Sequence, residues 1–256
     1  MDRMLEGHTA VITGGGKGIG AGISKKLAAA GANVVINCNS NPDMAEKTAL
    51  EIRQAGGQAI VYQADVGDRA QVDAMMAKAA EVFGGIDILV NNAAWQPNLD
   101  IDEYTEEFYD RIMNINLGGY FRCIQAALPY LKKSPCPRII NISSIHGKRP
   151  TDFDVCYSMT KGAIKMLTRE AAIELGKYGI TVNAILPGAV RIEFKSGYTR
   201  PFKRVQISRE RMYKYNPVNR IGIPDDVAEM VLFLASKKSS YITGAGIRMD
   251  GGSVLM

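Results

Sequence analysis

The stretch HTAVITGGGKGIG, residues 8–20, decides the fold. Residues 8–13 are apolar and rich in β-branched side chains, which predicts a strand, and Ile19, Ile23 and Leu27 then recur at helical spacing. Strand, glycine loop and helix in this order make a phosphate-binding arrangement, because glycines let the backbone approach a pyrophosphate at the helix N-terminus. A plain strand-to-helix turn also favours glycine, so it is the position directly after the first strand that indicates a dinucleotide site.

Strands and helices alternate along the rest of the chain. Short apolar runs predict further strands at residues 33–37, 59–64, 86–90, 138–142, 181–186 and 247–250. Helical patterns begin near Pro42 and cover about 72–83, 106–132, 157–178 and 224–234. This alternation predicts one doubly wound Rossmann-type α/β domain over residues 1–256, with a seven-stranded parallel sheet and helices on both faces. Ligands then gather at the carboxyl ends of the strands.

The composition excludes several classes of protein. Hydrophobic residues make up 46% of the 256, and no apolar run approaches the roughly eighteen residues of a membrane span. The first seven residues are polar and lack the apolar core of a signal peptide, so we expect a cytoplasmic protein that does not enter a membrane. The four cysteines show no C-x-x-C spacing and no partner histidines, which predicts reduced thiols and neither a metal site nor a disulfide framework.

Positive charge is concentrated in residues 191–220. This segment holds nine Lys or Arg and two Glu, so it carries +7, while the rest of the chain carries −2. No helix-turn-helix, zinc-finger or RNP-like pattern accompanies the charge, and we therefore expect no nucleic-acid partner. The segment lies between the sixth predicted strand and the next helix, where the family resemblance described below implies a flap over a small-molecule substrate.

The five residues Tyr157-Ser-Met-Thr-Lys161 carry the chemistry. A tyrosine and a lysine four residues apart lie on one face of a helix, one turn from each other. An ammonium about 4 Å from a phenol stabilises the phenolate by roughly 4 kcal/mol, which lowers the phenol pKa from about 10 by about three units. Tyr157 could then exchange protons near neutral pH. A surface Tyr and Lys stacked on a helix is the structural alternative.

The end of the second predicted strand bears on the choice of cofactor. In NAD-selective sites an acidic residue about twenty positions beyond the glycines holds the adenosine ribose. Here Asn37-Cys38-Asn39-Ser40 offers no carboxylate, whereas Lys17 in the glycine loop offers a cation for a 2′-phosphate. We therefore expect NADP to be preferred, with NAD still possible. The alternative is an exposed lysine beside a neutral, permissive ribose pocket.

Taken together, these residues resemble the short-chain dehydrogenase/reductase family over nearly the whole chain. Each motif is modest alone, but their order and spacing make the resemblance specific. The matching elements are Thr13-Gly-x-x-x-Gly-Ile-Gly20, Asp65-Val66, Asn91-Asn92-Ala93, Asn116, Ser144, Tyr157-x-x-x-Lys161, Asn183 and Pro187-Gly188.

The resemblance implies a catalytic group of four residues. Tyr157 would be the general acid and base, and Ser144 would hydrogen-bond the substrate oxygen. Lys161 would lower the tyrosine pKa and hold the nicotinamide ribose, while Asn116 would position a water that links the lysine to solvent. The hydride itself would come from or go to the cofactor.

The resemblance also implies the cofactor contacts and the assembly. Members of the family are usually homotetramers with a sheet-edge contact near the C-terminus. A threonine often stands at the position of Ile192 and bonds the carboxamide, so in this chain the backbone, for example at Val190, would take that part, or the carboxamide would be held more loosely. The expected cofactor-binding residues are Gly14, Lys17, Gly18, Ile19, Gly20, Asn37, Asp65, Val66, Asn92, Pro187, Gly188 and Val190.

The substrate is less well specified. His146, Trp95, Phe153 and Arg191 are expected at the substrate rim, and polar and aromatic groups suit a polyhydroxy compound. A loop position where His146 contacts only water is the alternative for that residue. We expect interconversion of a secondary alcohol and a carbonyl on a sugar or polyol, as in glucose 1-dehydrogenases.

Three other functions stay open. Bacterial 3-oxoacyl carrier-protein reductases resemble the chain almost as well as sugar dehydrogenases do, and hydroxysteroid dehydrogenases share the motifs. A member without catalysis could serve as an NADP(H) sensor, although the intact Asn116, Ser144, Tyr157 and Lys161 argue against it.

Overall fold

A computed structural model describes residues 3–150, 154–192 and 216–255. Strands alternate with helices along the chain, and short 3-10 turns occupy several connections. The seven strands are β1 (Thr9–Ile12), β2 (Asn33–Cys38), β3 (Gln58–Gln63), β4 (Ile88–Asn91), β5 (Arg138–Ile142), β6 (Thr181–Pro187) and β7 (Gly246–Met249). The α-helices are α1 (Gly18–Ala29), α2 (Pro42–Gln54), α3 (Arg69–Phe83), α4 (Glu106–Met113), α5 (Gly119–Leu131), α6 (Val155–Leu175) and α8 (Pro224–Ala235).

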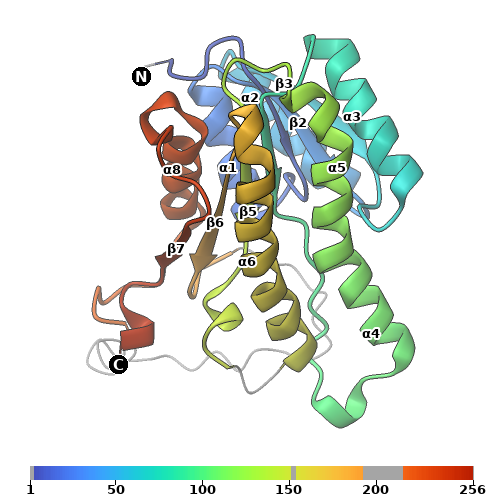
Figure 1. Ribbon diagram of the computed structural model, residues 1–256, viewed down its shortest axis with the longest axis vertical. Helices are drawn as coiled ribbons and strands as arrows, with labels where there is room; N and C mark the ends of the chain where they lie inside the picture. Colours follow the sequence, from blue (N-terminus) through green and yellow to red (C-terminus); the bar gives the residue numbers. More distant parts are fainter. Residues whose placement is uncertain (1–2, 151–153, 193–215, 256) are drawn as a thin grey trace.

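The strands form a single parallel sheet in the order β3-β2-β1-β4-β5-β6-β7 (Figure 1). In the middle of the sheet Val11 pairs with Val35 of β2 on one side and with Leu89 of β4 on the other. The chain therefore adds strands outward from β1 in one direction and then returns to continue from β1 in the other. This architecture confirms the predicted Rossmann-type fold, and the observed strand bounds differ from the predicted ones by only one or two residues.

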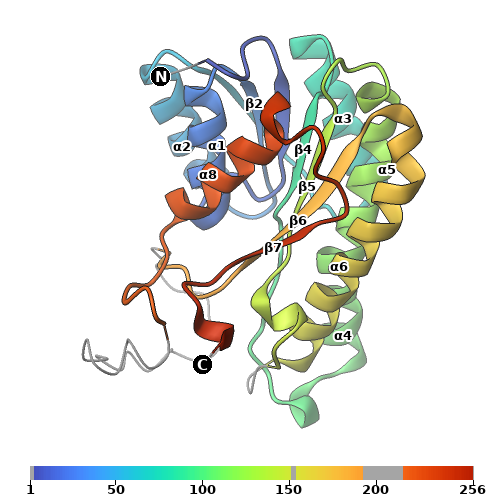
Figure 2. The same cartoon turned by 60° about the vertical axis from the view of Figure 1, so that its left-hand side comes forward.

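Side chains alternate between two apolar layers, one on each face of the sheet. Ile12 and its neighbours on one face pack with α1, α2 and α8, whereas Val11 and its neighbours on the other pack with α3, α5 and α6. Figure 2 shows these two groups of helices on opposite sides of the strands. Because both faces are covered, the strands are apolar throughout, as a buried parallel sheet requires.

Two local features of the helices set up the site. The predicted helix at 106–132 is interrupted by a π-helical turn, η2 (Asn114–Gly118), between α4 and α5. The sequence pattern did not predict this turn, and π-turns often lie at functional sites. The helix that carries the Tyr-Lys pair begins two residues earlier than predicted, at Val155, because Asp154 caps it by accepting a hydrogen bond from the Tyr157 amide.

All four cysteines are free and buried. Within 3–150, 154–192 and 216–255, no group of three His, Cys, Asp or Glu side chains is placed to hold a metal ion. In the same ranges, no helix combines the length and the apolar character needed to cross a bilayer. Most of the basic segment at 191–220 lies outside the described residues.

Candidate active site

A cavity of about 420 Å³ opens at the carboxyl ends of the strands, where the strand order reverses between β1 and β4. The loops after six of the strands contribute to its wall, which is the position expected for a ligand of an open α/β sheet. The lining residues that come from the predicted site are Gly14, Lys17, Gly18, Ile19, Gly20, Asn37, Asp65, Val66, Asn92, Trp95, Ser144, Tyr157, Lys161, Pro187 and Gly188.

Two glycines shape the cradle after β1. Gly14 has φ +62°, a backbone conformation that favours glycine, and a Cβ there would lie 3.1 Å from the Ala93 Cα. A Cβ on Gly20 would lie 2.7 Å from the Asn92 Nδ2 and would also collide with the Gly14 carbonyl. Side chains at these positions would push apart the loops after β1 and β4, which line the cavity at the N-terminus of α1.

Thr13 joins the β1 loop to the β4 loop. Its hydroxyl oxygen accepts hydrogen bonds from the Asn92 amide at 2.9 Å and the Ala93 amide at 3.0 Å. The Asn92 side chain returns the contact by donating to the carbonyls of Thr13 and Gly14. The two loops therefore hold the glycine cradle open as one unit. Thr13 was noticed only as part of the glycine motif, and its role depends on contacts that no local pattern displays.

Asn37 lies at the end of β2 and lines the cavity. Its side chain is buried: the oxygen accepts from the Gly14 amide at 3.2 Å, and the nitrogen donates to the Ala64 carbonyl at 2.9 Å. The side-chain amide of Asn37 therefore fixes the glycine loop to the sheet. Asn39 and Ser40 are exposed and line the same end of the cavity, where their side chains are not buried as that of Asn37 is.

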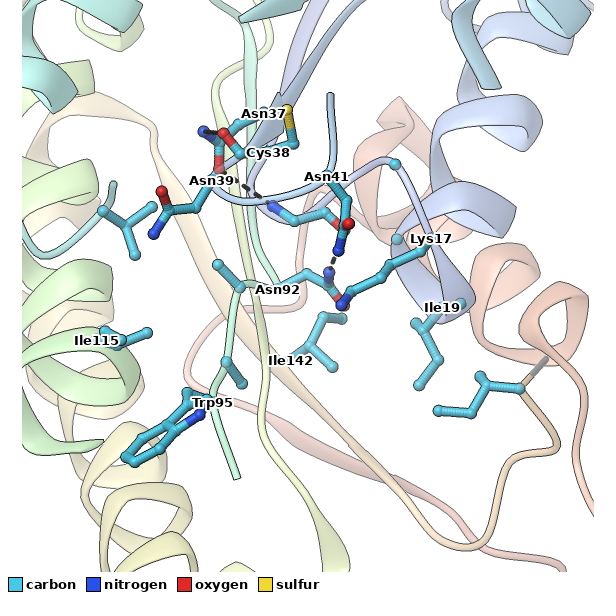
Figure 3. Close-up of a pocket in the computed structure, with 18 of the residues that line it drawn as sticks. Lys17, Ile19, Asn37, Cys38, Asn39, Asn41, Asn92, Trp95, Ile115 and Ile142 are labelled. Atoms are coloured by element: carbon cyan, nitrogen blue, oxygen red, sulfur yellow. Dashed lines mark hydrogen bonds between the residues drawn. The ribbon is translucent and has the colours of Figure 1, made fainter. Parts of the chain in front are cut away.

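Lys17 and the residues after β2 face one another across one end of the cavity, while Trp95 and Ile115 lie toward the other (Figure 3). Lys17 is exposed and occupies the N-cap position of α1. At the end of β3, Asp65 and Val66 add to the wall. The described part of this end contains a cation and several neutral polar side chains, as the sequence predicted.

Tyr157, Lys161 and Ser144 meet at the centre of the cavity wall. Tyr157 and Lys161 come from neighbouring turns of α6, and the Lys161 Nζ lies 5.5 Å from the centre of the Tyr157 ring. Lys161 is fully enclosed and donates hydrogen bonds to the Ile142 carbonyl at 2.8 Å and to the Tyr120 hydroxyl at 3.4 Å. Burial lowers the pKa of Lys161 to about 7.

Ser144 follows β5 and caps the short turn η3 (Ile145–Gly147). Its hydroxyl oxygen accepts a hydrogen bond from the His146 amide at 3.1 Å, so its proton can be donated to a group in the cavity. His146 itself does not line the cavity, and its ring Nδ1 lies 3.4 Å from the Arg149 carbonyl. The substrate contact of the His146 ring stays a prediction.

Asn116 lies in the π-helical turn and is buried behind the cavity wall. Its side chain accepts from the Trp95 amide at 2.7 Å and donates to the Trp95 carbonyl at 2.9 Å, which ties the β4 loop to the helices. Trp95 in turn stacks on Phe108, and the Arg111 guanidinium lies 4.5 Å above the Trp95 ring. Arg111 also lines the cavity, a position that sequence reasoning missed.

The loop after β6 supplies the last part of the site. Val190 does not line the cavity and pairs with Gly222 in an isolated β-bridge. In this bridge the Gly222 amide donates to the Ala189 carbonyl, and the Arg191 amide donates to the Gly222 carbonyl. The Val190 amide and carbonyl are thus left outside that bridge. Ile192 lines the cavity and packs against Gly18. Arg191 is exposed and outside the lining, and Phe153 lies outside the described residues.

Comparisons with known proteins agree with this geometry. Residues 14–254 match the family model described as enoyl-(acyl carrier protein) reductase. The chain is 35% identical to glucose 1-dehydrogenase 2 of Bacillus subtilis, over 100% of this chain and 98% of the relative. It is 36% identical to the 3-oxoacyl-(acyl-carrier-protein) reductase of Staphylococcus aureus, over 95% and 97%. A short chain dehydrogenase from Burkholderia cenocepacia, solved in complex with NADP, superposes with a TM-score of 0.88 at 33% identity, over 98% of this chain and 99% of that one.

Proposed function

The chain belongs to the short-chain dehydrogenase/reductase family of NAD(P)-dependent oxidoreductases, and from this premise we propose that it interconverts a secondary alcohol and a carbonyl on a sugar or polyol. The observation that carries the proposal is the meeting of Tyr157, Lys161 and Ser144 in one cavity with the glycine cradle of β1. Tyr157 offers a proton donor and acceptor, Lys161 a cation and Ser144 a hydroxyl donor. These groups would lie beside the nicotinamide end of a dinucleotide bound in the cavity.

The residues present fit a nicotinamide dinucleotide. Gly14, Gly18 and Gly20 line the cavity beside the positive N-terminus of α1, and side chains at Gly14 and Gly20 would collide with the neighbouring loops that form this wall. When bound, the cofactor supplies the hydride. Gly14, Lys17, Gly18, Ile19 and Gly20 would hold its phosphates and adenosine ribose, Asp65 and Val66 its adenine, and Asn92, Pro187, Gly188 and the Val190 backbone its nicotinamide side.

The catalytic residues divide the proton chemistry. Tyr157 would take the proton from the substrate hydroxyl in oxidation and return it to the carbonyl oxygen in reduction. Ser144 would donate its proton to the same oxygen, with its hydroxyl held in place by the hydrogen bond that it accepts from the His146 amide. Lys161 would stabilise the Tyr157 phenolate, and the two groups would titrate as a pair.

Asn116 would act behind this group. Its side chain is occupied by the Trp95 backbone, so its contribution is to fix the β4 loop. A water linking Lys161 to solvent would then have to be held by backbone atoms of the π-helical turn.

NADP is the cofactor we propose to be preferred. Lys17 provides a cation, and among Asn37, Asn39 and Ser40 there is no carboxylate to repel a 2′-phosphate. The solved relative from Burkholderia cenocepacia was crystallised with NADP, which agrees with this choice.

A sugar or polyol fits the substrate end better than a purely apolar ligand. Trp95, held between Phe108 and Arg111, adds an aromatic side chain to the wall, and Arg111 and Ser144 offer hydrogen-bond donors. The full-length similarity to a glucose 1-dehydrogenase supports the same substrate class.

Reduction of 3-oxoacyl thioesters is the second candidate, and the basic segment at 191–220 favours it. Nine cations there could guide an acidic carrier protein to the site. Two described members weaken the argument, because Arg191 does not line the cavity and Arg220 is held by Asp226 in a bidentate ion pair with N–O distances of 2.6 and 2.7 Å.

A substrate panel at low and high ionic strength separates the candidates. We expect the protein to oxidise a neutral sugar or polyol with NADP at a kcat/KM that stays nearly constant as salt rises, because no charges attract the substrate. Cofactor absorbance measures the rate. Salt-sensitive reduction of 3-oxoacyl thioesters, with no sugar oxidation, would replace the first candidate by the second.

Tyr157→Phe is the control for the chemistry. The variant removes the proton carrier and little volume, so it should lose turnover by roughly 10²-fold or more while binding NADPH as the parent does. Fluorescence titration measures that binding. Retention of more than a few per cent of the activity would contradict the mechanism.

A further inference from the structure

The inference concerns Tyr120 on α5, a residue that no motif singled out and that does not line the cavity. Its side chain is fully buried beneath Lys161, with the Lys161 Nζ 5.3 Å from the ring centre. The same Nζ lies 5.5 Å from the ring of Tyr157. The amine of Lys161 is therefore held between two phenols, one facing the cavity and one behind it.

The hydrogen bonds fix which way the Tyr120 hydroxyl points. It donates its proton to the Ile142 carbonyl at 2.9 Å, so its oxygen can only accept from Lys161. The Ile142 carbonyl also accepts from the Lys161 Nζ, at 2.8 Å. These are the two hydrogen-bond acceptors of the ammonium, and they leave its third N–H for the cavity.

We propose that Tyr120 is a positioning residue: its hydroxyl, held as an acceptor by Ile142, keeps the Lys161 ammonium in place and charged beside Tyr157. This inference rests on the proposed roles of Tyr157 and Lys161. Without the hydroxyl, the buried ammonium loses one of its two acceptors, and its charged form becomes less stable. The Tyr157 phenolate then loses part of the cation that stabilises it.

The surroundings contain few other groups that could provide this stabilisation. Among the described residues no carboxylate forms an ion pair with Lys161. β6 and η2 contribute no ionisable side chain, α4 carries its ionisable side chains at exposed positions, and η3 contributes His146. Burial raises the pKa of Tyr120 well above 10 and that of its α5 neighbour Cys123 to about 12, so both stay protonated.

An ultraviolet difference titration of Tyr157 tests the proposal without any substrate. In the parent, the phenolate signal of Tyr157 is obtained by subtracting the titration curve of Tyr157→Phe. In the Tyr120→Phe protein, it is obtained by subtracting the curve of the Tyr120→Phe, Tyr157→Phe double variant. We expect Tyr120→Phe to raise the pKa of Tyr157 by about half a unit to one unit. Tyr130→Phe, the same change at a half-buried position of α5, should leave that pKa unchanged.

Kinetics provide a second readout. In the direction of alcohol oxidation, kcat of Tyr120→Phe should fall about three- to tenfold near pH 7 and approach the parent value at higher pH, because the base form of Tyr157 is reached later. A lesion that only loosened the structure would lower kcat at every pH. If Tyr120→Phe does not fold, 3-fluorotyrosine at position 120 keeps the volume with a weaker acceptor and should shift the pKa in the same direction by less.

The outcomes separate this inference from the function it rests on. A Tyr157 pKa that is lowered in the parent but unchanged in Tyr120→Phe overturns the role of Tyr120 alone. A Tyr157 that titrates near 10 in the parent overturns the Tyr-Lys pair and the role of Tyr120 with it.

Discussion

Lys161 brings an amine into the interior, where its charge is costly. Burial lowers its pKa from 10.5 to about 7, so the unfolded chain binds this proton more tightly than the folded chain does. Stability must therefore rise with pH across the window from about 7 to 10.5 and be lowest below it. The site retains this cost because the same charge supports Tyr157.

Lys161→Met should remove that pH dependence. We expect the free energy of unfolding of the parent to rise by about 2 kcal/mol relative to the variant between about pH 7 and pH 9, while the variant loses turnover. Urea unfolding at a series of pH values measures the difference. If the stability of the two proteins changed with pH in the same way, the Lys161 amine would have the same pKa in the folded and unfolded chain, which would contradict the prediction.

The cofactor choice is also decided by single residues. Lys17→Ala should weaken NADPH binding more than NADH binding, by about tenfold, because only NADPH carries the 2′-phosphate. Asn39→Asp should shift preference toward NADH by repelling that phosphate, whereas Asn37→Asp would place a carboxylate against the Ala64 carbonyl and disturb the fold. Fluorescence titration with both cofactors measures the ratio, and equal affinities in the parent would contradict the proposed preference.

At the scale of elements, the N-terminus of α6 is held by one side chain. Asp154 accepts hydrogen bonds from the Tyr157 amide at 2.8 Å, the Tyr104 hydroxyl at 2.6 Å and the Asn98 amide at 3.2 Å. Burial and the contact with Asp154 raise the pKa of Tyr104 well above 10, so that hydroxyl keeps its proton and stays a donor. Asp154 thereby fixes the first turn of α6, which carries Tyr157, to the loop before α4.

Asp154→Asn should loosen this turn. An amide offers one acceptor oxygen for three donors, so we expect a loss of about 1–2 kcal/mol in stability and a fall in kcat of roughly tenfold. Asp68→Asn, the same change at the N-cap of α3, should cost stability without lowering kcat. Denaturant unfolding and steady-state rates measure the two effects, and an unchanged kcat in Asp154→Asn would show that the cap does not position Tyr157.

At the scale of the whole molecule, α6 turns an apolar stripe toward solvent. Met159, Met166 and Ile173 recur every seven residues and are exposed, with Ile173 at 77%. Several large apolar side chains exposed on one face of a helix favour an interface between proteins. The stripe is therefore a surface on which the predicted homotetramer could assemble.

Light scattering checks the assembly. We expect a mass near four times 27.8 kDa for the parent and a smaller species for a Met166→Glu, Ile173→Glu double variant, because buried carboxylates would face apolar partners. Leu50→Glu on α2 is the matched control, since Leu50 is 49% exposed and Met166 52%. A mass near 27.8 kDa for the parent, as expected of a monomer, would contradict the expectation.

The fold could be predicted well because the strands and helices of a parallel sheet protein leave local patterns in the sequence. Each buried strand is a short apolar run, and each helix has its own spacing, so the bounds of β5 were predicted to the residue. The glycine loop and the Tyr157-Lys161 pair were likewise visible as motifs. The contacts of His146 with Ser144 and Arg149 are local but depend on how the loop after β5 turns, which the sequence pattern does not show. The hydrogen bonds of Asn37 were not predicted because Gly14 and Ala64 lie far from it along the chain. Tyr120 was missed for the same reason, since its hydroxyl meets Ile142 only after folding.

The link between Thr13 and the loop after β4 has a consequence for folding during synthesis. The Thr13 hydroxyl bonds amides about eighty residues later, and β1 lies between β2 and β4 in the sheet. A nascent chain that has already produced β1, the glycine loop and α1 therefore still lacks the walls that complete the cradle. The ribosome must release the segment through Ala93 before a dinucleotide could be captured, and α6 and the loop after β6 come later still. Dinucleotide capture would thus report that the two halves of the sheet have joined, and it could stabilise the molecule only after that event.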